Sequence, residues 1–346
     1  MSPVVTAARR SPGVVESSVL PKIVGLGGNL HAAVFQLMKL LPAQFILQQA
    51  TASGELDAGT TVIETTSGTF GLGLAIVCRL RGNPLILVGD PAIDAALRRR
   101  LTDLGVQVHI VAGRQLAKNG VQQARLDRLA RIQRRHEKFY TPRQYDNPLN
   151  AASYRPVADL ITERLGRVDV LVCPVGSGGS SSGIASVLRE RFPDLRLVGV
   201  DTPGSVLFGA PVGPRPLRGL GSGIVPQVLE HSLFDEVHWV GAAEAFASTR
   251  GLYADHCLYM GPSSGAAHLV AAAVARRRPD AVTLVVMPDE GHRYQRTVHD
   301  PRWLRRQDLF TSVVPHRPVD VDHPTEVVGG WSRFAWNRRT REQVVT

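Results

Sequence analysis

Short runs of β-branched and aliphatic residues alternate with helical segments along most of this chain, and that alternation constrains its fold more than any other feature. Strands are expected at 60–65, 84–88, 106–111, 168–172, 195–200, 236–240 and 282–287. Helices are expected at 34–53, 71–81, 92–104, 154–165, 181–190, 242–253 and 265–277. Because strands that alternate with helices form parallel sheets wrapped by helices, the sequence predicts an α/β fold.

Interruptions rich in glycine and proline, at 113–120 and 140–150, divide the chain, and the periodicity fades beyond about Arg306. A chain of 346 residues is long enough for two domains with well-buried cores. We expect an N-terminal α/β domain at 1–150, a second α/β domain at 151–310 and a C-terminal tail at 311–346.

Composition limits the classes of partner. The net charge is +10, but the arginine clusters are scattered through different expected helices without interleaved aromatic residues, which favours solvated helix faces over a nucleic-acid site. No apolar run approaches the roughly 20 residues of a membrane-spanning helix, and no secretory signal follows the first basic residues. The three cysteines are too widely spaced for a metal site or a disulfide framework. We therefore expect a cytoplasmic protein that binds neither nucleic acid, membrane nor metal.

Lysine is scarce, since the 40 basic residues include only Lys22, Lys39, Lys118 and Lys138 as lysines. A lysine amine can lose its proton in a protein whereas an arginine cannot, so each lysine is a candidate for chemistry. We attribute three of them to an arginine-rich composition. Lys39 differs because its neighbours are apolar, which would desolvate the amine and lower its pKa. The alternative is an amphipathic lysine whose amine reaches water.

A glycine and serine loop, Gly176–Ser180, lies between an expected strand and an expected helix. Backbone amides and hydroxyls at such a junction can bind a phosphate. A dinucleotide site is a rival interpretation, because Asp201 ends the next strand at the spacing of a ribose-binding carboxylate. Ser181 stands where the third glycine of that motif belongs, and a purely structural turn also stays open.

A second small-residue turn, Thr66–Gly71, follows another strand and predicts an anion site suited to a carboxylate, with an ordinary helix cap as the alternative. A third turn covers Gly261–Gly265. An amine for an aldehyde, amides for a phosphate and a partner for a ring nitrogen are the anchors of pyridoxal phosphate. The three turns together with Lys39 therefore point to that cofactor.

These motifs resemble those of the cysteine synthase and cystathionine β-synthase family of fold-type II pyridoxal-phosphate enzymes. Thr66–Gly71 is similar to the family's T-S-G-N-T-G turn, Gly176–Ser180 to its G-T-G-G-T loop and Gly261–Ala266 to its G-x-S-S-G-A turn. Further likenesses at Gln144–Asn150 and Pro288–Tyr294 extend the match, in order, over about residues 20 to 300. The resemblance implies a tryptophan synthase β-like fold with the cofactor between two α/β domains.

The resemblance also implies residue roles. Lys39 corresponds to the Schiff-base lysine and catalytic base. Cofactor contacts are implied for Lys39, Thr69, Gly176, Ser177, Gly178, Gly179, Ser180 and Ser263. Substrate contacts are expected for Thr66, Ser67, Phe70, Gln144 and Arg218.

Some residues depart from the family pattern. The family usually has S-x-K-D-R around its lysine, whereas Lys39 is followed by two leucines and a proline. Thr69 replaces an asparagine, and Phe70 replaces a threonine and adds apolar bulk beside the substrate. Arg218 ends a segment that leads into the loop facing the site in relatives, where an arginine suits a second carboxylate or a phosphoryl leaving group. An ordinary surface arginine is the alternative.

The implied activity is cysteine synthase-like, with β-elimination followed by β-replacement on an activated serine of the O-acetylserine or O-phosphoserine type through an aminoacrylate. A hydroxyl at Ser263 leaves the ring nitrogen unprotonated, which favours loss of a β-leaving group over transamination or racemisation. Because Phe70 changes the surroundings of the substrate, the reaction can involve a non-standard small nucleophile. Alternatives are a serine or threonine dehydratase, a non-catalytic pyridoxal-phosphate-fold binding protein and, third, a dehydrogenase.

A homodimer is expected for two reasons. Relatives in this family pair through the larger domain. Trp331 and Trp336 lie in an otherwise polar tail and need a covering surface, unless that tail is disordered.

Overall fold

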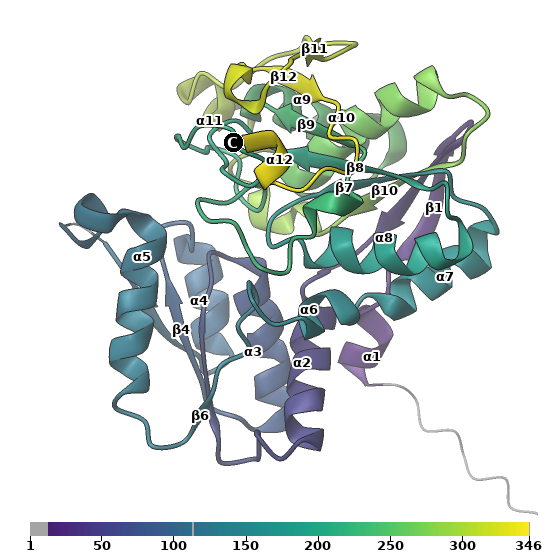
Figure 1. Cartoon of the computed structure of the whole chain (residues 1–346). Helices are drawn as coiled ribbons and strands as arrows, with labels where there is room; N and C mark the ends of the chain where they lie inside the picture. Colours follow the sequence, from purple (N-terminus) through teal and green to yellow (C-terminus); the bar gives the residue numbers. More distant parts are fainter. Residues whose placement is uncertain (1–12, 113, 346) are drawn as a thin grey trace, which may run out of the picture.

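The computed structural model describes residues 13–112 and 114–345, whose strands form a smaller and a larger sheet (Figure 1). The strands of the smaller sheet are all parallel, in the order β5 (Gln107–Ile110), β4 (Leu85–Gly89), β3 (Thr61–Thr65) and β6 (Phe139–Tyr140). The larger sheet has the order β1 (Lys22–Gly27), β2 (Leu30–Val34), β10 (Thr283–Met287), β7 (Val170–Pro174), β8 (Arg196–Asp201), β9 (Glu236–Val240), β12 (Trp331–Phe334) and β11 (Val319–Asp320).

Helices pack around both sheets, which confirms the predicted α/β class (Figure 1). Those beside the smaller sheet are α2 (Leu40–Ala52), α3 (Thr69–Arg81), α4 (Ala95–Asp103) and α5 (Arg114–Gln133). Those beside the larger sheet are α7 (Arg155–Leu165), α8 (Gly179–Arg191), α9 (Ala242–His256) and α10 (Pro262–Arg277). Short helices α1 (Val14–Ser18), α6 (Leu149–Ala152), α11 (Pro301–Arg306) and α12 (Glu342–Val345) complete the α-helices of the described residues.

The buried strand β7 shows why the larger sheet needs helices on both faces. Successive side chains of a strand point to opposite faces. Leu171 and Cys173 join the core cluster that contains Ile184 of α8, whereas Val172 joins the cluster that contains Val270 of α10. This near-continuous apolar strand, which the sequence predicts, is therefore buried on both of its faces.

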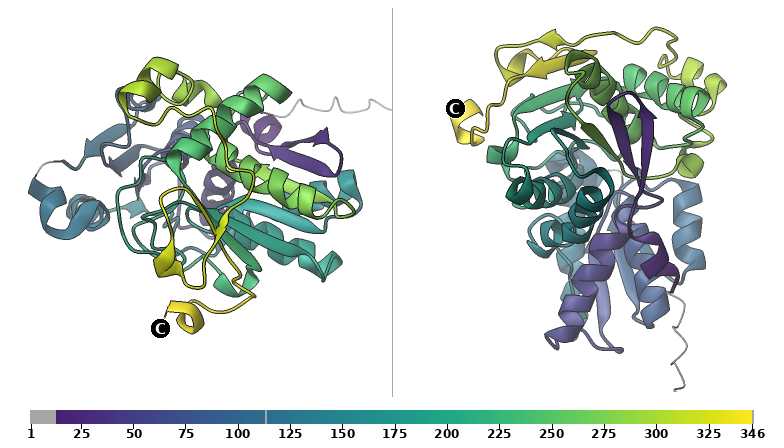
Figure 2. Two further views of the ribbon diagram at one scale, coloured as in Figure 1. Left: turned by 90° about the horizontal axis from the view of Figure 1, so that it is seen from above. Right: turned by 90° about the vertical axis from the view of Figure 1, so that its right-hand side faces the viewer.

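Strands from both ends of the chain complete the larger sheet. β1 pairs antiparallel with β2, and β2 lies parallel to β10, so this N-terminal ribbon forms one edge of the larger sheet (Figure 2). At the other side, β12 pairs antiparallel with β9. The described part of the smaller sheet comes from residues 61–140. The division of the chain near residue 150 stays a proposal.

The helix expected at 34–53 begins later than predicted. Val34 ends β2, and α2 begins at Leu40 with Lys39 as its N-cap. Pro42 fits here because proline is tolerated in the first turn of a helix. The difference matters for function, since it places the Lys39 amine at a helix terminus rather than along a helical face.

The C-terminal segment is folded against the larger sheet, and both of its tryptophans are covered within this chain. Trp331 is 2% and Trp336 0% exposed, and the Trp331 indole donates a 3.0 Å hydrogen bond to Nδ1 of His238. They therefore give no support to the argument that a partner chain must cover them.

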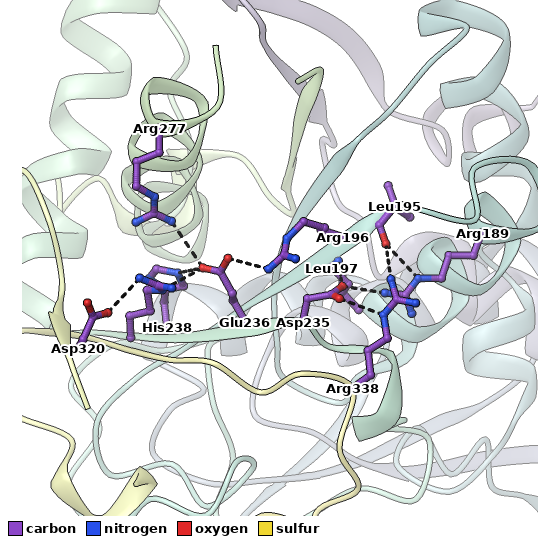
Figure 3. A network of polar contacts seen from close by, with 11 residues as sticks. Arg189, Leu195, Arg196, Leu197, Asp235, Glu236, His238, Arg277, Asp320 and Arg338 are labelled. Carbon is purple, nitrogen blue, oxygen red and sulfur yellow. Dashed lines mark hydrogen bonds and ion pairs between the residues drawn. The ribbon is translucent and has the colours of Figure 1, made fainter. Parts of the chain in front are cut away.

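Charged contacts fasten this segment to β9 and its surroundings (Figure 3). Glu236 accepts hydrogen bonds from Arg333 at 3.1 Å and from Arg196 at 3.0 Å. Asp235 accepts one from Arg338 at 2.9 Å. Because carboxylates bound to several guanidinium groups are strongly stabilised when partly buried, these contacts hold the C-terminal strand in place.

Across residues 13–112 and 114–345, no helix combines the length and the apolar character that crossing a membrane requires.

Candidate active site

Lys39 lies where α2 begins and faces the first turn of α8. Its Nζ donates a 3.1 Å hydrogen bond to Oγ of Ser177. Burial lowers the pKa of the Lys39 amine from its ordinary value of 10.5 to about 8. Desolvation disfavours the ammonium form, so a larger fraction of this amine is neutral near physiological pH than of an exposed lysine. A neutral amine can attack an aldehyde or accept a proton.

The predicted phosphate loop connects β7 to α8. Gly178 is the N-cap of α8 with φ of 85°, a conformation that favours glycine. A Cβ at Gly178 would lie 2.7 Å from Leu229, and one at Gly179 would lie 2.4 Å from Oδ1 of Asn150. The glycines thus keep the backbone close to its surroundings at the start of a helix. Helix amides and neighbouring serine hydroxyls are the donor set that a phosphate needs, so this loop fits the phosphate of the predicted cofactor.

The turn between β3 and α3 is organised by Thr66. Its Oγ1 accepts hydrogen bonds from the backbone N–H groups of Gly68 and Gly71, each at 3.1 Å. Thr66 is only 1% exposed, while Ser67 is exposed. The N-cap of α3 is Gly68 rather than Thr66 or Ser67, although the Thr66 hydroxyl still accepts from Gly71 in the first turn of that helix. The exposed Ser67 leaves a hydroxyl available to a ligand.

Glu64 joins this turn to the segment that contains Gln144. The carboxylate of Glu64 accepts from the backbone N–H of Thr65 at 2.7 Å and of Gln144 at 3.3 Å. The Gln144 side chain in turn donates to the Thr65 carbonyl at 2.9 Å. Burial raises the pKa of Glu64 from 4.5 to about 7. Glu64 is the penultimate residue of β3, close to the small-residue turn, and nothing in the sequence pattern singled it out.

Two small adjoining cavities bring most of the predicted site residues together. They have volumes of about 50 and about 100 Å³, and both are lined by Lys39, Thr69, Gly176, Ser177 and Gly219. The smaller is also lined by the predicted residues Ser180 and Ser263, and the larger by Thr66, Ser67, Phe70 and Gln144. Of the other predicted residues, Gly178 and Gly179 form the start of α8 and line neither cavity.

Arg218 is the predicted residue that lies apart from both cavities. Its Nη1 donates a 2.8 Å hydrogen bond to the Ala92 carbonyl, and its side chain lines a separate cavity of about 360 Å³. The structure therefore does not bring Arg218 into contact with the space around Lys39.

Asp289 and Tyr294 line the smaller cavity and were not singled out by the sequence. The Tyr294 hydroxyl donates a 2.9 Å hydrogen bond to Oδ2 of Asp289, and burial raises the pKa of Asp289 from 3.8 to about 6. A Cβ at Gly261 would lie 2.5 Å from Oδ1 of Asp289. The glycine of the third turn is therefore needed for this carboxyl to sit beside Ser263. The likeness to the family at Pro288–Tyr294 was the sequence feature from which a role for both residues could have been predicted.

Comparison with known proteins places this arrangement among enzymes of one cofactor class. A family model described as pyridoxal-phosphate dependent enzyme matches residues 38–289. The chain is 32% identical over 308 residues to the N-(2-amino-2-carboxyethyl)-L-glutamate synthase of Cupriavidus metallidurans, covering 84% of this chain and 90% of the relative. It is 35% identical over 299 residues to the synthase of the same name from Ralstonia nicotianae, covering 83% and 88%.

A curated cysteine synthase and a solved structure are similar as well. The cysteine synthase of Staphylococcus aureus is 29% identical over 257 residues, which is 73% of this chain and 81% of the relative. The crystal structure of a hydrogen sulfide-producing enzyme from Fusobacterium nucleatum gives a TM-score of 0.76 at 26% identity and covers 82% of this chain and 100% of that one.

Proposed function

This chain belongs to the family of pyridoxal-phosphate-dependent enzymes, and we propose that it catalyses β-replacement with the amine of an amino acid as the nucleophile. The fold-type II assignment, the cofactor and the cysteine synthase-like chemistry expected from the sequence are confirmed. What we propose beyond this is the identity of the nucleophile. Two relatives are named for a product in which the nitrogen of L-glutamate carries a 2-amino-2-carboxyethyl group.

The names of these two relatives support the choice of nucleophile, and the observation that carries the β-replacement chemistry is the position of Lys39. Its amine lies between the glycine loop before α8 and the turn after β3, and it lines both cavities. When bound, pyridoxal phosphate supplies an aldehyde for this amine and an electron sink that weakens bonds at the substrate α-carbon. Lys39 Nζ would hold the cofactor. Once freed by the incoming substrate, it would remove the proton from that carbon.

The remaining residues would bind and orient the reactants. The loop Gly176–Ser180 at the start of α8 would hold the phosphate, and Ser67 with Gln144 would hold the substrate carboxylate. Ser263 would meet the ring nitrogen with a hydroxyl that does not protonate it. An unprotonated ring nitrogen favours departure of a leaving group from the β-carbon, such as acetate or phosphate from an activated serine.

We further propose a homodimer in the cytoplasm. The resemblance to enzymes that pair through their larger domain supports the dimer, and the three free cysteines suit a reducing compartment. Light scattering at micromolar concentration tests the dimer, and cell fractionation tests the compartment.

Product analysis tests the proposed reaction. The holoenzyme is incubated with O-phosphoserine or O-acetylserine and L-glutamate, and products are separated and weighed by mass spectrometry. We expect an adduct that joins the serine-derived three-carbon unit to the glutamate nitrogen. Formation of pyruvate and ammonia alone would assign the chain to the dehydratases instead. An adduct with sulfide but with no amino acid would restrict it to cysteine synthesis.

A further inference from the structure

A cavity of about 360 Å³ lies beside the candidate active site and carries three arginines, Arg215, Arg218 and Arg293. Phe246 and Trp303 provide an apolar part of its lining. The three arginines lie in segments that connect strands of the larger sheet. Two of them contact Ala92, which belongs to the loop after β4 of the smaller sheet. The cavity therefore lies where the two sheets' connecting loops meet.

Each of the three guanidinium groups donates a hydrogen bond to a backbone carbonyl. Arg218 Nη1 and Arg293 Nη2 both donate to the Ala92 carbonyl, at 2.8 and 3.0 Å. Arg215 Nη1 donates to the Gly204 carbonyl at 2.8 Å. A guanidinium has five N–H donors, so each group keeps donors for a ligand. Nε of Arg293 is buried and has no hydrogen-bond partner in the described structure.

Negative charge at this cavity is small compared with the positive charge. Asp94 is the one carboxylate that lines it, its Oδ2 lies 3.9 Å from Arg293 Nε, and its Oδ1 caps α4 through the Leu97 N–H. Asp201 interacts electrostatically with Arg215, but burial raises the pKa of Asp201 to about 7, so it is partly neutral at physiological pH. Guanidinium groups gathered in a cavity repel one another, and a bound anion relieves that repulsion while accepting charge-assisted hydrogen bonds.

The cavity adjoins the space around Lys39. Tyr294 lines both this cavity and the smaller of the two active-site cavities. Arg218 immediately precedes Gly219, which lines both active-site cavities. A ligand held by the arginines would therefore lie next to the place where the nucleophile must arrive.

We propose that this arginine cavity binds a dicarboxylate, and that its occupant during turnover is the dicarboxylic amino acid that serves as nucleophile. The carboxylates would pair with the arginines, while the methylene groups would lie against Phe246 and Trp303. The identity of the occupant rests on the proposed function, whereas the binding of a dicarboxylate does not.

Titration calorimetry of the holoenzyme with glutarate tests the site without turnover. Arg218→Gln and Arg215→Gln should each weaken glutarate binding by about tenfold, because each removes charge-assisted hydrogen bonds. Arg218→Lys, which keeps the charge and loses the planar fork, should weaken it less. Arg296→Gln is the matched control, since Arg296 is exposed and does not line the cavity. Failure of glutarate to bind the parent, or equal binding by the parent and both glutamine variants, would overturn the site.

Selectivity during turnover tests the occupant. The parent should prefer L-glutamate to L-glutamine as nucleophile, and Arg218→Gln should reduce that ratio of kcat/KM by about tenfold. An unchanged ratio in a parent that forms the glutamate adduct would overturn the assignment of the cavity to the nucleophile. If glutarate binds through the arginines but the parent forms no amino-acid adduct, the dicarboxylate site stands, while the proposed nucleophile and its role as occupant both fall.

Discussion

The Lys39 amine donates a hydrogen bond of 3.1 Å to the Ser177 hydroxyl, and this contact joins the start of α2 to the glycine loop before α8. Two segments far apart in the sequence therefore present an amine and an anion-binding loop to one small space.

Lys39 should carry the cofactor. Borohydride reduction of the holoenzyme followed by peptide mapping should place the label on Lys39, and Lys39→Ala should lower kcat by roughly a thousandfold, within the range of a lost acid–base group. Label on Lys22 or Lys138, with Lys39 unmodified, would contradict the assignment.

The pH dependence of cofactor capture should follow the Lys39 amine. Below its pKa of about 8 the amine is protonated and cannot attack the aldehyde, so the rate should rise by about tenfold per pH unit and level off above that value. Absorbance changes on adding pyridoxal phosphate to cofactor-free enzyme measure this rate. A rate that keeps rising to pH 10 would indicate an ordinary exposed lysine.

Ser263 should influence which reaction follows cofactor binding. Ser263→Asp places a carboxylate where we propose that the ring nitrogen lies, and should slow β-replacement by at least about tenfold, or roughly 1.4 kcal/mol of barrier. Ser263→Ala should weaken cofactor binding, measured by equilibrium dialysis. Ser264→Ala is the control because Ser264 does not line the cavities around Lys39. Equal turnover by Ser263→Asp and the parent would remove Ser263 from the site.

Glu64 should make stability depend on pH. Its folded-state pKa of about 7 is raised above its ordinary value of 4.5, so the contribution is complete below the unfolded pKa and is lost as pH rises through the folded pKa. Between pH 4.5 and 7.5 the unfolding free energy of the parent should fall by about 3 kcal/mol relative to Glu64→Gln. Urea unfolding at both pH values measures this difference. Parallel pH profiles for the two proteins would exclude Glu64 as the cause.

Trp331→Phe should destabilise the C-terminal segment. The substitution removes the donor to Nδ1 of His238, which is 0% exposed, and leaves that acceptor without its indole partner. Loss of a buried partner costs about 1–3 kcal/mol, and thermal unfolding measures it. An unchanged melting temperature would show that this hydrogen bond contributes little to the stability of the segment.

The sequence predicted those parts of the site that depend on local pattern. Thr66–Gly71 and Gly176–Ser180 lie at strand-to-helix turns as expected, because small residues and adjoining apolar strands mark such turns directly. Lys39 lies at the start of a helix because β2 pairs with β10, a partner far along the chain that no local pattern reveals. The same limit explains why the sequence indicates only a tail at 311–346, where β12 pairs with β9.

The roles of two buried carboxyl groups were also not predicted from the sequence. Glu64 and Asp289 look like ordinary charged residues in the sequence, and only the folded chain shows that one supports the Gln144 segment and the other contacts Tyr294 beside the cavity. Arg218 was predicted from its place before a loop, yet the side chain turns toward Ala92.

The N-terminal ribbon sets an order for synthesis. β2 is synthesised long before its parallel neighbour β10. The smaller sheet, by contrast, draws its strands from one continuous stretch and can assemble while translation continues. Long-range pairing of this kind is slow and leaves unpaired edges exposed. The nascent chain must therefore keep β2 from wrong partners until β10 has been made.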